Sequence, residues 1–442
     1  MNVSGHIDRL VSPFQDLIRD ERYSSYLLIL TTIIALVIAN SPARIDYEAF
    51  LHLSIGFHFG EWTFEKSIKH WVNDGLMAMF FYTLGLEVKR EFLVGELKDI
   101  RNSTAIIFSA VGGMIVPAAT FFLLNRNLST VDGWGIPMAT DAAFAVGVLS
   151  LLKGRIPVAL TAFLVALAII DDLGAIAVIA LFYTKTINIE ALTGACILFG
   201  LLVLINYTGV RRSSVYFLAG IVLWFLMEFS GVHPTLAGVA VALTVPARPE
   251  HSDNWMIRRI EWLLKLIKIR KVQQQHQIDM LADEKQHKLV ERLEESARKV
   301  TTPLRRWESS LERPVILFVL PIFALVNAGI PVDYSILSTV IKDNLSWGII
   351  LGLFIGKPLG ITLFCWLSTK TGYGRLPEGL SFNQIAGMAM LGGIGFTMSI
   401  FIAGLSFSSE VLLGSAKLSV FIASLMSGIL GFIWLRFIVT SK

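Results

Sequence analysis

Three ionisable residues lie deep inside apolar segments of this sequence. Asp171 and Asp172 are the fifteenth and sixteenth residues of the apolar run at 157 to 183. At 1.5 Å per residue this depth is about 22 Å along a helix of about 40 Å. Lys357 lies near the middle of another apolar run, at 346 to 367. Charge is costly in hydrocarbon and by default indicates a functional site, which we favour over a purely structural acid pair.

A third acid adds to this set. Asp141 follows Thr140 in an apolar segment at 136 to 152. A buried lysine needs a counter-charge, and neighbouring residues on a helix point about 100° apart. One aspartate of the pair can therefore face Lys357 while the other faces a cavity with Asp141.

These residue types suit ion binding. Carboxylate and hydroxyl oxygens are the ligands that hard cations prefer, so Asp171, Asp172 and Thr140 could hold sodium. Each carboxylate can bind a proton or share the cation, but not both. Exclusive binding at one site that opens to one side of a membrane at a time gives exchange without a covalent step.

The elements that must position these residues are membrane-spanning helices. The 442 residues are 54% hydrophobic and only 16% charged, against roughly 25% charged in globular domains. A helical span needs about 20 apolar residues, and twelve candidate segments are predicted. They lie at 24–40, 71–87, 104–124, 136–152, 157–183, 190–206, 213–229, 231–245, 314–329, 346–367, 382–403 and 415–438. Cys196 and Cys365 lie within apolar runs, so we expect no disulfide framework.

Lysine and arginine are distributed unequally between the two sides of these segments. Outside the long connection at 246 to 313, 15 lie in the tails and even-numbered connections and seven lie in the others. Because cytoplasmic loops carry the excess of positive charge, both termini are predicted to be cytoplasmic. Topology thus accounts for the net charge of +4, and no nucleic-acid partner is expected.

Two charged regions are predicted to lie outside the lipid. Residues 1 to 23 form a cytoplasmic N-terminus that is not a cleavable signal peptide, with an amphipathic surface helix at 5 to 21. The connection at 246 to 313 contains 15 Lys/Arg and 11 Asp/Glu. It is predicted to be cytoplasmic and partly helical, with one or two helices at 254 to 300. A solvated linker and a partner-binding helix both fit this composition.

Between the first two spans, apolar and polar residues alternate. Leu51, Leu53, Ile55, Phe57 and Phe59 alternate with polar residues or glycine, and the alternation resumes after a Gly-Glu turn. This pattern predicts an external β-hairpin at about 51 to 68. Its apolar face needs a cover, either a second copy of the protein or the lipid headgroup region. The hairpin falls within spans 1–8, at 24 to 245, while spans 9–12 occupy 314 to 442.

Two segments are interrupted in ways that suit transport. Pro137 and the polar pair that follows it break the fourth, and the stretch 392–395, Gly-Gly-Ile-Gly, breaks the eleventh. Discontinuous helices in corresponding positions of two halves point to a transporter site. Pro117 in the third segment and Pro358 in the tenth suggest that segments 3–5 and 10–12 are inverted repeats. The predicted fold is an all-α polytopic membrane protein with about 12 transmembrane helices, inverted-topology repeats and two discontinuous crossing helices.

Five motifs resemble those of the NhaA-type sodium/proton antiporter family, over nearly the whole chain apart from the long connection. They are Leu-Glu-Val-Lys-Arg-Glu at 86–91, Met-Ala-Thr-Asp-Ala-Ala-Phe-Ala from 138, Ile-Ile-Asp-Asp-Leu-Gly-Ala from 169, Gly-Lys-Pro-Leu-Gly from 356 and Gly-Ile-Gly-Phe-Thr-Met-Ser-Ile-Phe from 393. The resemblance implies a secondary transporter, not an enzyme, that needs no cofactor. It would export Na⁺, and also Li⁺, in exchange for H⁺ across the bilayer of a bacterial inner membrane, serving pH homeostasis and salt tolerance.

The resemblance also implies roles for single residues. Asp172 would be the principal sodium ligand. Asp171 would share the cation and form an exchangeable ion pair with Lys357, which would carry a proton. Thr140 and Asp141 would lie where two broken helices cross, with Asp141 compensating their facing dipoles.

Regulation by pH is a further implication. On residues alone, the charged stretch that ends the second span fits either an inside anchor or a gating mouth. The resemblance assigns pH sensing to Glu87, Arg90 and Glu91, together with Glu308 at the start of the ninth helix. It also implies electrogenic exchange, activated at alkaline pH, in a homodimer that forms through the hairpin at 51 to 68.

Three other functions fit these residues less well than exchange does. A sodium-coupled symporter of an organic anion would need a second, roomier cavity and has less use for Lys357. An intramembrane aspartyl protease could pair Asp141 with Asp172, but the Gly-x-Gly-Asp signature is missing and the lysine would disturb a shared proton. A passive cation channel is disfavoured because a mid-membrane ion pair would obstruct rapid flow.

Overall fold

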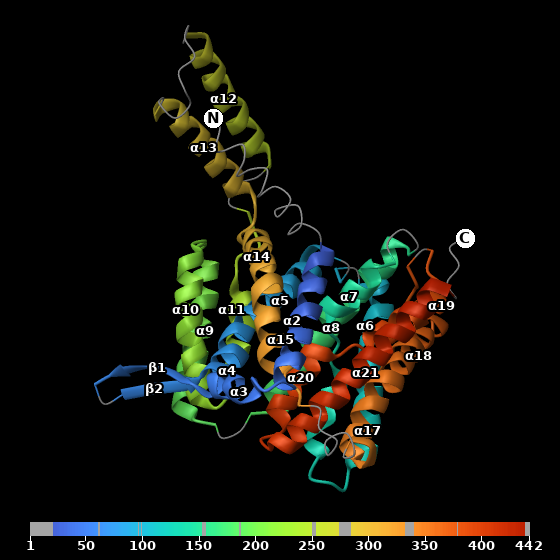
Figure 1. The fold of residues 1–442 in the computed structure, drawn as a ribbon. Coiled ribbons are helices and arrows are strands. Elements are labelled where there is room, and N and C mark those ends of the chain that lie inside the picture. Colours follow the sequence, from blue (N-terminus) through green and yellow to red (C-terminus); the bar gives the residue numbers. More distant parts are fainter. Residues whose placement is uncertain are drawn as a thin grey trace, which may run out of the picture.

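The computed structural model describes residues 21–60, 62–95, 97–98, 100–152, 156–184, 187–249, 253–273, 284–331, 340–377 and 379–437. Within them the chain is mostly helical, with one two-stranded sheet. Most helices form one bundle, from which the hairpin projects at one end and a pair of helices projects at the other (Figure 1). The predicted surface helix at 5 to 21 falls almost wholly outside the described residues.

The helical elements follow one another with few long connections. In chain order they are α2 (Glu21–Ala39), α3 (Arg44–His52), α4 (Ile68–His70), η1 (Trp71–Leu76), α5 (Met77–Val94), α6 (Ile100–Asn125), η2 (Val131–Met138), α7 (Ala142–Ser150), α8 (Val158–Phe182), α9 (Ile189–Tyr207), α10 (Ser213–Ser230), α11 (Leu236–Thr244), α12 (Asp253–Gln273), α13 (Glu284–Val300), α14 (Pro303–Pro314), η3 (Val315–Val319), α15 (Leu320–Asn327), α17 (Asn344–Leu351), η4 (Gly352–Gly356), α18 (Lys357–Lys370), α19 (Phe382–Gly392), α20 (Phe396–Ser406) and α21 (Glu410–Phe437). The η elements are short 3₁₀ or π-helical stretches, which often mark strained or functional positions.

Seven helices of the described chain are long and apolar enough to cross a membrane, or up to nine if each of two bent pairs counts as one span. This number is lower than the twelve predicted segments, although each of those segments contains helix. Several predicted segments are interrupted or short, as in α11, which has nine residues. Length and composition therefore establish a multi-pass membrane protein, while the count of crossings stays a prediction.

The helix of the ninth segment begins earlier than its apolar residues suggest. It runs from Pro303 to Asn327 through α14, η3 and α15, whereas the predicted span begins at residue 314. Thr302 caps its first turn by accepting a hydrogen bond from the backbone N–H of Arg305, and proline follows the cap. A capped, charged first turn is a normal helix start, so hydropathy alone misses it.

The projecting pair belongs to the long connection. Helices α12 and α13 pack against each other beyond the end of α14 (Figure 1). The chain leaves and rejoins the bundle at neighbouring points, because the backbone N–H of Leu304 donates to the carbonyl of Pro246 at 3.1 Å. The connection therefore leaves the bundle and returns to it at closely spaced points.

The predicted hairpin is present, with a later start. Strands β1 (Ser54–Phe59) and β2 (Trp62–Ser67) pair antiparallel, and Phe57 lies opposite Phe64. Residues 51 and 52, which the alternation placed in the hairpin, belong to α3 instead. Gly60 in the turn has a φ of 63°, a conformation that favours glycine. Phe64 is buried against aromatic rings of the bundle, while Phe57 is 60% exposed.

Helices α6 and α18 cross in close contact near the middle of the bundle. Helix α18 crosses α6 at Gly360 and Gly112, and a Cβ atom on either glycine would collide with the backbone carbonyl of the other. Small residues at such crossings let two backbones approach. This crossing sets the first turn of α18, and with it Lys357, against the bundle interior.

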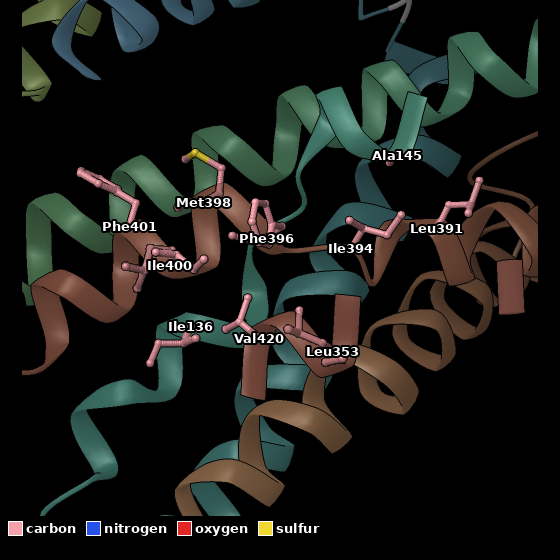
Figure 2. Close-up of a cluster of buried hydrophobic side chains, with 14 of the residues drawn as sticks. Ile136, Ala145, Leu353, Leu391, Ile394, Phe396, Met398, Ile400, Phe401 and Val420 are labelled. Atoms are coloured by element: carbon pink, nitrogen blue, oxygen red, sulfur yellow. The ribbon is translucent and has the colours of Figure 1, made fainter. Parts of the chain in front are cut away.

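Two helical segments are broken at the same level of the bundle. Between η2 and α7 the backbone is extended at Ala139 and Asp141. Between α19 and α20 the helix axis bends by 46°. Figure 2 shows buried apolar side chains around both breaks, including Ile136 of η2, Ile394 between α19 and α20, and Phe396 of α20. The polar groups at the breaks therefore lie in an apolar, close-packed setting.

Candidate functional site

Asp171 and Lys357 meet in the centre of the bundle. Asp171 comes from the middle of α8 and Lys357 from the first residue of α18, and the side chains of both are fully buried. The Lys357 Nζ lies 2.9 Å from Asp171 Oδ2 and also donates to the carbonyl of Met138. A buried charge persists only when it is paired and hydrogen-bonded, and this pair meets that condition.

The second aspartate has no such partner. Asp172 is 3% exposed, and its Oδ1 has no hydrogen-bond partner among the described residues. The same holds for Oδ1 of Asp171, the oxygen that does not face the lysine. Gly113 of α6 faces that oxygen, since a Cβ atom there would lie 3.9 Å from it. Two buried carboxylate oxygens thus have capacity to accept a proton or a cation.

Thr140 connects the aspartate pair to the broken helices. Its hydroxyl lies 2.6 Å from Asp171 Oδ2 and 3.1 Å from the carbonyl of Gly392, the last residue of α19. Thr140 is itself fully buried, in the extended stretch before α7. The hydroxyl can donate its proton to one of these oxygens, and its lone pairs remain available to a cation.

Asp141 caps two helices at once. Its Oδ1 accepts from the backbone N–H of Phe144 at 3.1 Å, at the start of α7. Its Oδ2 accepts from the backbone N–H of Thr397 at 2.9 Å, at the start of α20. A carboxylate at a helix N-terminus is stabilised by the N–H groups and by the helix dipole. Here one carboxylate serves two N-termini.

Several functional contacts were not foreseen from the sequence. The Thr397 hydroxyl also donates to Asp141 Oδ2, and Ser399 Oγ donates to the carbonyl of Ile136 at 2.7 Å. Backbone carbonyls of Met138 and Gly392 face the lysine and the threonine. Thr397 and Ser399 are the polar residues of the apolar stretch from Gly393, and this polarity is the sequence signal that could have indicated the first two contacts. Nothing in the sequence indicates which carbonyls become free at a break.

The four residues assigned to pH sensing lie at the end of the bundle that carries α12 and α13 (Figure 1). Arg90 of α5 pairs with Glu308 of α14 at 2.6 Å and with Glu91 at 2.5 Å. Glu87, one turn before on α5, interacts electrostatically with all three. The structure therefore groups these four residues, which come from α5 and α14, whereas the aspartate pair lies on α8.

Comparison with known proteins identifies the family. The family described as Na+/H+ antiporter 1 matches residues 15–435. Na(+)/H(+) antiporter NhaA 2 of Psychromonas ingrahamii is 46% identical over 437 residues, which cover 99% of this chain and 91% of that protein. Na(+)/H(+) antiporter NhaA 1 of Saccharophagus degradans is 44% identical over 430 residues, covering 97% and 92%. Na(+)/H(+) antiporter NhaA 1 of Shewanella denitrificans is 43% identical over 435 residues, covering 98% and 96%. A family match over nearly the whole chain and relatives of this identity show that the chain belongs to the Na+/H+ antiporter 1 family, a family of membrane transporters and not of enzymes.

Proposed function

We propose that this protein exports Na⁺, and also Li⁺, in exchange for H⁺ by alternating access at Asp171 and Asp172. The observation that carries the proposal is the pair of buried carboxylate oxygens, one on each aspartate, that have no hydrogen-bond partner among the described residues. Leaving such oxygens unsatisfied is costly in an apolar interior, so the site favours an occupant. A proton and a small hard cation both meet that need.

Binding of the two ions is mutually exclusive for an electrostatic reason. Asp172 is the principal sodium ligand, and Asp171 shares the cation when its ion pair with Lys357 opens. The Thr140 hydroxyl, 2.6 Å from Asp171 Oδ2, contributes a further oxygen. Since a sodium ligand must be deprotonated, protons compete with the cation for the carboxylates.

The net charges of the proton-loaded and sodium-loaded sites differ, which makes the proposed exchange electrogenic. In the proton-loaded site Lys357 and Asp172 each hold a proton and Asp171 is ionised, so the three residues together are neutral. In the sodium-loaded site both aspartates are ionised, the lysine is neutral and one sodium is bound, so the total charge is −1. The two loaded states differ by one charge, and more protons enter than sodium ions leave.

The broken helices supply the moving framework. Thr140 and Asp141 lie at their crossing, where Asp141 offsets the positive ends of both α7 and α20. With the dipoles neutralised by a fixed carboxylate, a shift of either half-helix is not opposed by an uncompensated buried charge. We further infer twelve crossings, with segments 3–5 and 10–12 as inverted repeats around this point.

The charged group at the end of α5 regulates exchange by pH. The joint between α5 and α14 is formed by Glu87, Arg90, Glu91 and Glu308, and the ion pair of Arg90 with Glu308 connects the two helices. The arrangement that this joint takes at alkaline pH is the active one. We place the protein in the bacterial inner membrane, with both termini in the cytoplasm. Its exchange of ions would serve pH homeostasis and salt tolerance of the cell.

Assembly into a homodimer through the hairpin completes the proposal. Ile55 and Phe57 of β1 are more than half exposed, so an apolar surface remains at the hairpin. A second copy would cover it. Deletion of the hairpin should halve the mass of the purified protein in detergent, and a mass unchanged by the deletion would exclude this contact.

Reconstituted protein tests the exchange directly. The protein is reconstituted into proteoliposomes that have an acidic lumen and a pH-sensitive dye. Na⁺ or Li⁺ added outside should release protons from the lumen, and K⁺ should not. Asp172→Asn should abolish exchange, because an amide can neither bind and release a proton nor supply an anionic oxygen to Na⁺. For wild type, the sodium concentration giving half-maximal rate should rise as pH falls, because protons compete for the ligand.

The matched control is Asp46→Asn, which neutralises an exposed acid on α3. It should leave both the rate and its pH dependence unchanged. If Na⁺ moves no protons in wild type at any pH from acidic to alkaline, exchange is excluded. Sodium-dependent uptake of organic anions would then be measured as the alternative.

A further inference from the structure

A second group of ionisable side chains lies where the hairpin joins the bundle. His70 ends α4, Asp74 lies in η1, Glu228 lies near the end of α10, and His233 lies in the connection from α10 to α11. The side chains of Asp74 and Glu228 are each 11% exposed. None of the contacts of the aspartate–lysine site involves these residues, so ion exchange does not account for them.

Three of these groups converge on one point. His70 Nε2 lies 3.0 Å from Asp74 Oδ2 and 3.2 Å from Glu228 Oε1. Ligand atoms from all three residues lie within 4.8 Å of one another. Ligands about 2.0–2.1 Å from a tetrahedral zinc ion are about 3.3 Å apart, which is close to the two distances from His70 Nε2.

A second imidazole borders the same point. His233 Nε2 lies 3.6 Å from Asp74 Oδ1. The other ring nitrogen, Nδ1, is 2.9 Å from the hydroxyl of Thr235. A hydrogen bond at one nitrogen fixes the ring and directs the other toward a ligand, as in histidines that bind metals. His233 can therefore act as a fourth ligand after a small shift.

The surrounding packing holds these elements in place. Trp224 of α10 stacks on Trp71 of η1 with ring centroids 5.7 Å apart, and its indole N–H donates to the backbone carbonyl of Asp74. Groups from α4, η1 and α10 thus share a rigid frame. A preformed arrangement lowers the cost of binding an ion.

We propose that His70, Asp74, Glu228 and His233 form a binding site for a divalent transition-metal ion of the zinc class. Two imidazoles with two carboxylates match the nitrogen and oxygen ligands of zinc, while sodium, magnesium and calcium prefer oxygen alone. The site is separate from the transport site and ties the base of the hairpin to α10. It opens to solvent through His70, whose side chain is 29% exposed.

Lys66 is the competitor for this ion. Its Nζ lies 2.5 Å from Glu228 Oε1, and it comes from strand β2. Its ammonium supplies a positive charge where a metal ion would bind. The metal must displace this ammonium, and the side chain, 33% exposed, can turn into solvent. Removing the lysine charge should therefore tighten metal binding.

Metal binding by the purified full-length protein tests the proposal. The protein is isolated through a tag without histidine, stripped with a chelator and dialysed against Zn²⁺, and bound metal is measured by mass spectrometry. We expect about one ion per chain in wild type. His70→Gln and Asp74→Asn should weaken binding by about 100-fold or more, and Lys66→Gln should strengthen it. A tetrahedral visible spectrum with Co²⁺ should report nitrogen and oxygen ligands.

Two controls separate this site from other sources of binding. His58→Gln removes an exposed histidine that lies 2.8 Å from Glu65, a pair outside the cluster, and should leave binding unchanged. Asp172→Asn should abolish exchange and keep the metal, so the two proposals fail independently. Equal binding by wild type and His70→Gln, or no binding by wild type, overturns the metal site. Unchanged or weaker binding in Lys66→Gln removes Glu228 from it.

Discussion

Asp171 carries two contacts on one carboxylate oxygen and none on the other. Oδ2 accepts from Lys357 and from Thr140, while Oδ1 has no partner among the described residues. A residue that only joined helices would be expected to satisfy both oxygens, because each unmade hydrogen bond costs about 1–3 kcal/mol. At the scale of single residues, the uneven use of this carboxylate is the clearest sign of a binding function.

The Thr140 hydroxyl should contribute measurably to sodium binding. Thr140→Val keeps the shape but leaves Asp171 and the Gly392 carbonyl without this donor. A hydrogen bond to a charged group is worth about 1.5–3 kcal/mol, so the sodium concentration for half-maximal exchange should rise by roughly tenfold or more. Thr140→Ser keeps the hydroxyl and should restore most of the affinity. Equal kinetics in the valine and serine variants would exclude the hydroxyl as a ligand.

At the scale of elements, the crossing of α18 with α6 determines where the lysine lies. Gly360 and Gly112 permit a backbone approach that no side chain would allow. Lys357 begins α18 only three residues before Gly360. A displacement of the crossing would therefore move the ammonium away from Asp171.

Gly360→Ala should lower the melting temperature of the purified protein and raise the sodium requirement of exchange. Overpacking costs typically about 1–3 kcal/mol. Gly200→Ala is the matched control, because it makes the same change within helix α9 where nothing lies within 4 Å of the new methyl group. A Gly360 variant as stable as the Gly200 variant would show that the crossing can relax.

The joint between α5 and α14 should control the pH profile. Glu308→Gln removes the carboxylate that pairs with Arg90 at 2.6 Å. Because the ion pair that connects α5 to α14 is lost, activity should change less with pH, while the maximal rate stays within about threefold of wild type. Glu410→Gln, which neutralises an exposed acid at the start of α21, is the control and should keep the wild-type profile. A profile unaltered in Glu308→Gln would remove this residue from regulation.

At the scale of the whole molecule, helices α12 and α13 project from the bundle as a pair (Figure 1). These helices pack against each other, and the chain returns to the bundle beside its point of departure. Among the described residues, the polar side-chain contacts of Asp171 and Thr140 come from the stretch before α7 and from α8, α18 and α19 rather than from these helices. The hairpin differs, because Phe64 is buried against α10 and Lys66 contacts Glu228.

Replacing residues 250 to 300 with a short Gly/Ser linker should leave exchange intact. The two ends already meet at the 3.1 Å contact of Leu304 with Pro246, so closing the gap imposes little strain. We expect sodium affinity and melting temperature to match wild type. Loss of exchange in a variant that still elutes as a folded protein would assign these helices a direct part in transport.

Much of this protein can be predicted from local sequence. Hydropathy identifies the helical segments, period-two alternation identifies the hairpin, and charge inside apolar runs identifies Asp171, Asp172 and Lys357. These features are local, since burial of a segment and the conformation of a turn depend on neighbouring residues. Helix ends are predicted less well, as the start at Pro303 shows, because a capped polar turn carries no hydropathy signal.

The contacts between buried residues cannot be predicted in this way, because they depend on how helices distant in the sequence cross. From the residues alone either aspartate could face the lysine, and only the packing of α6, α8 and α18 brings Lys357 to Asp171 and leaves Asp172 open. The capping of α7 and α20 by Asp141, and the convergence of His70, Asp74 and Glu228, arise in the same way. The sequence by itself determined which residues are buried and charged, since that follows from composition along one segment. Only the tertiary structure decided which of them meet, because rotation and crossing of helices are set by side-chain packing between segments far apart in the chain.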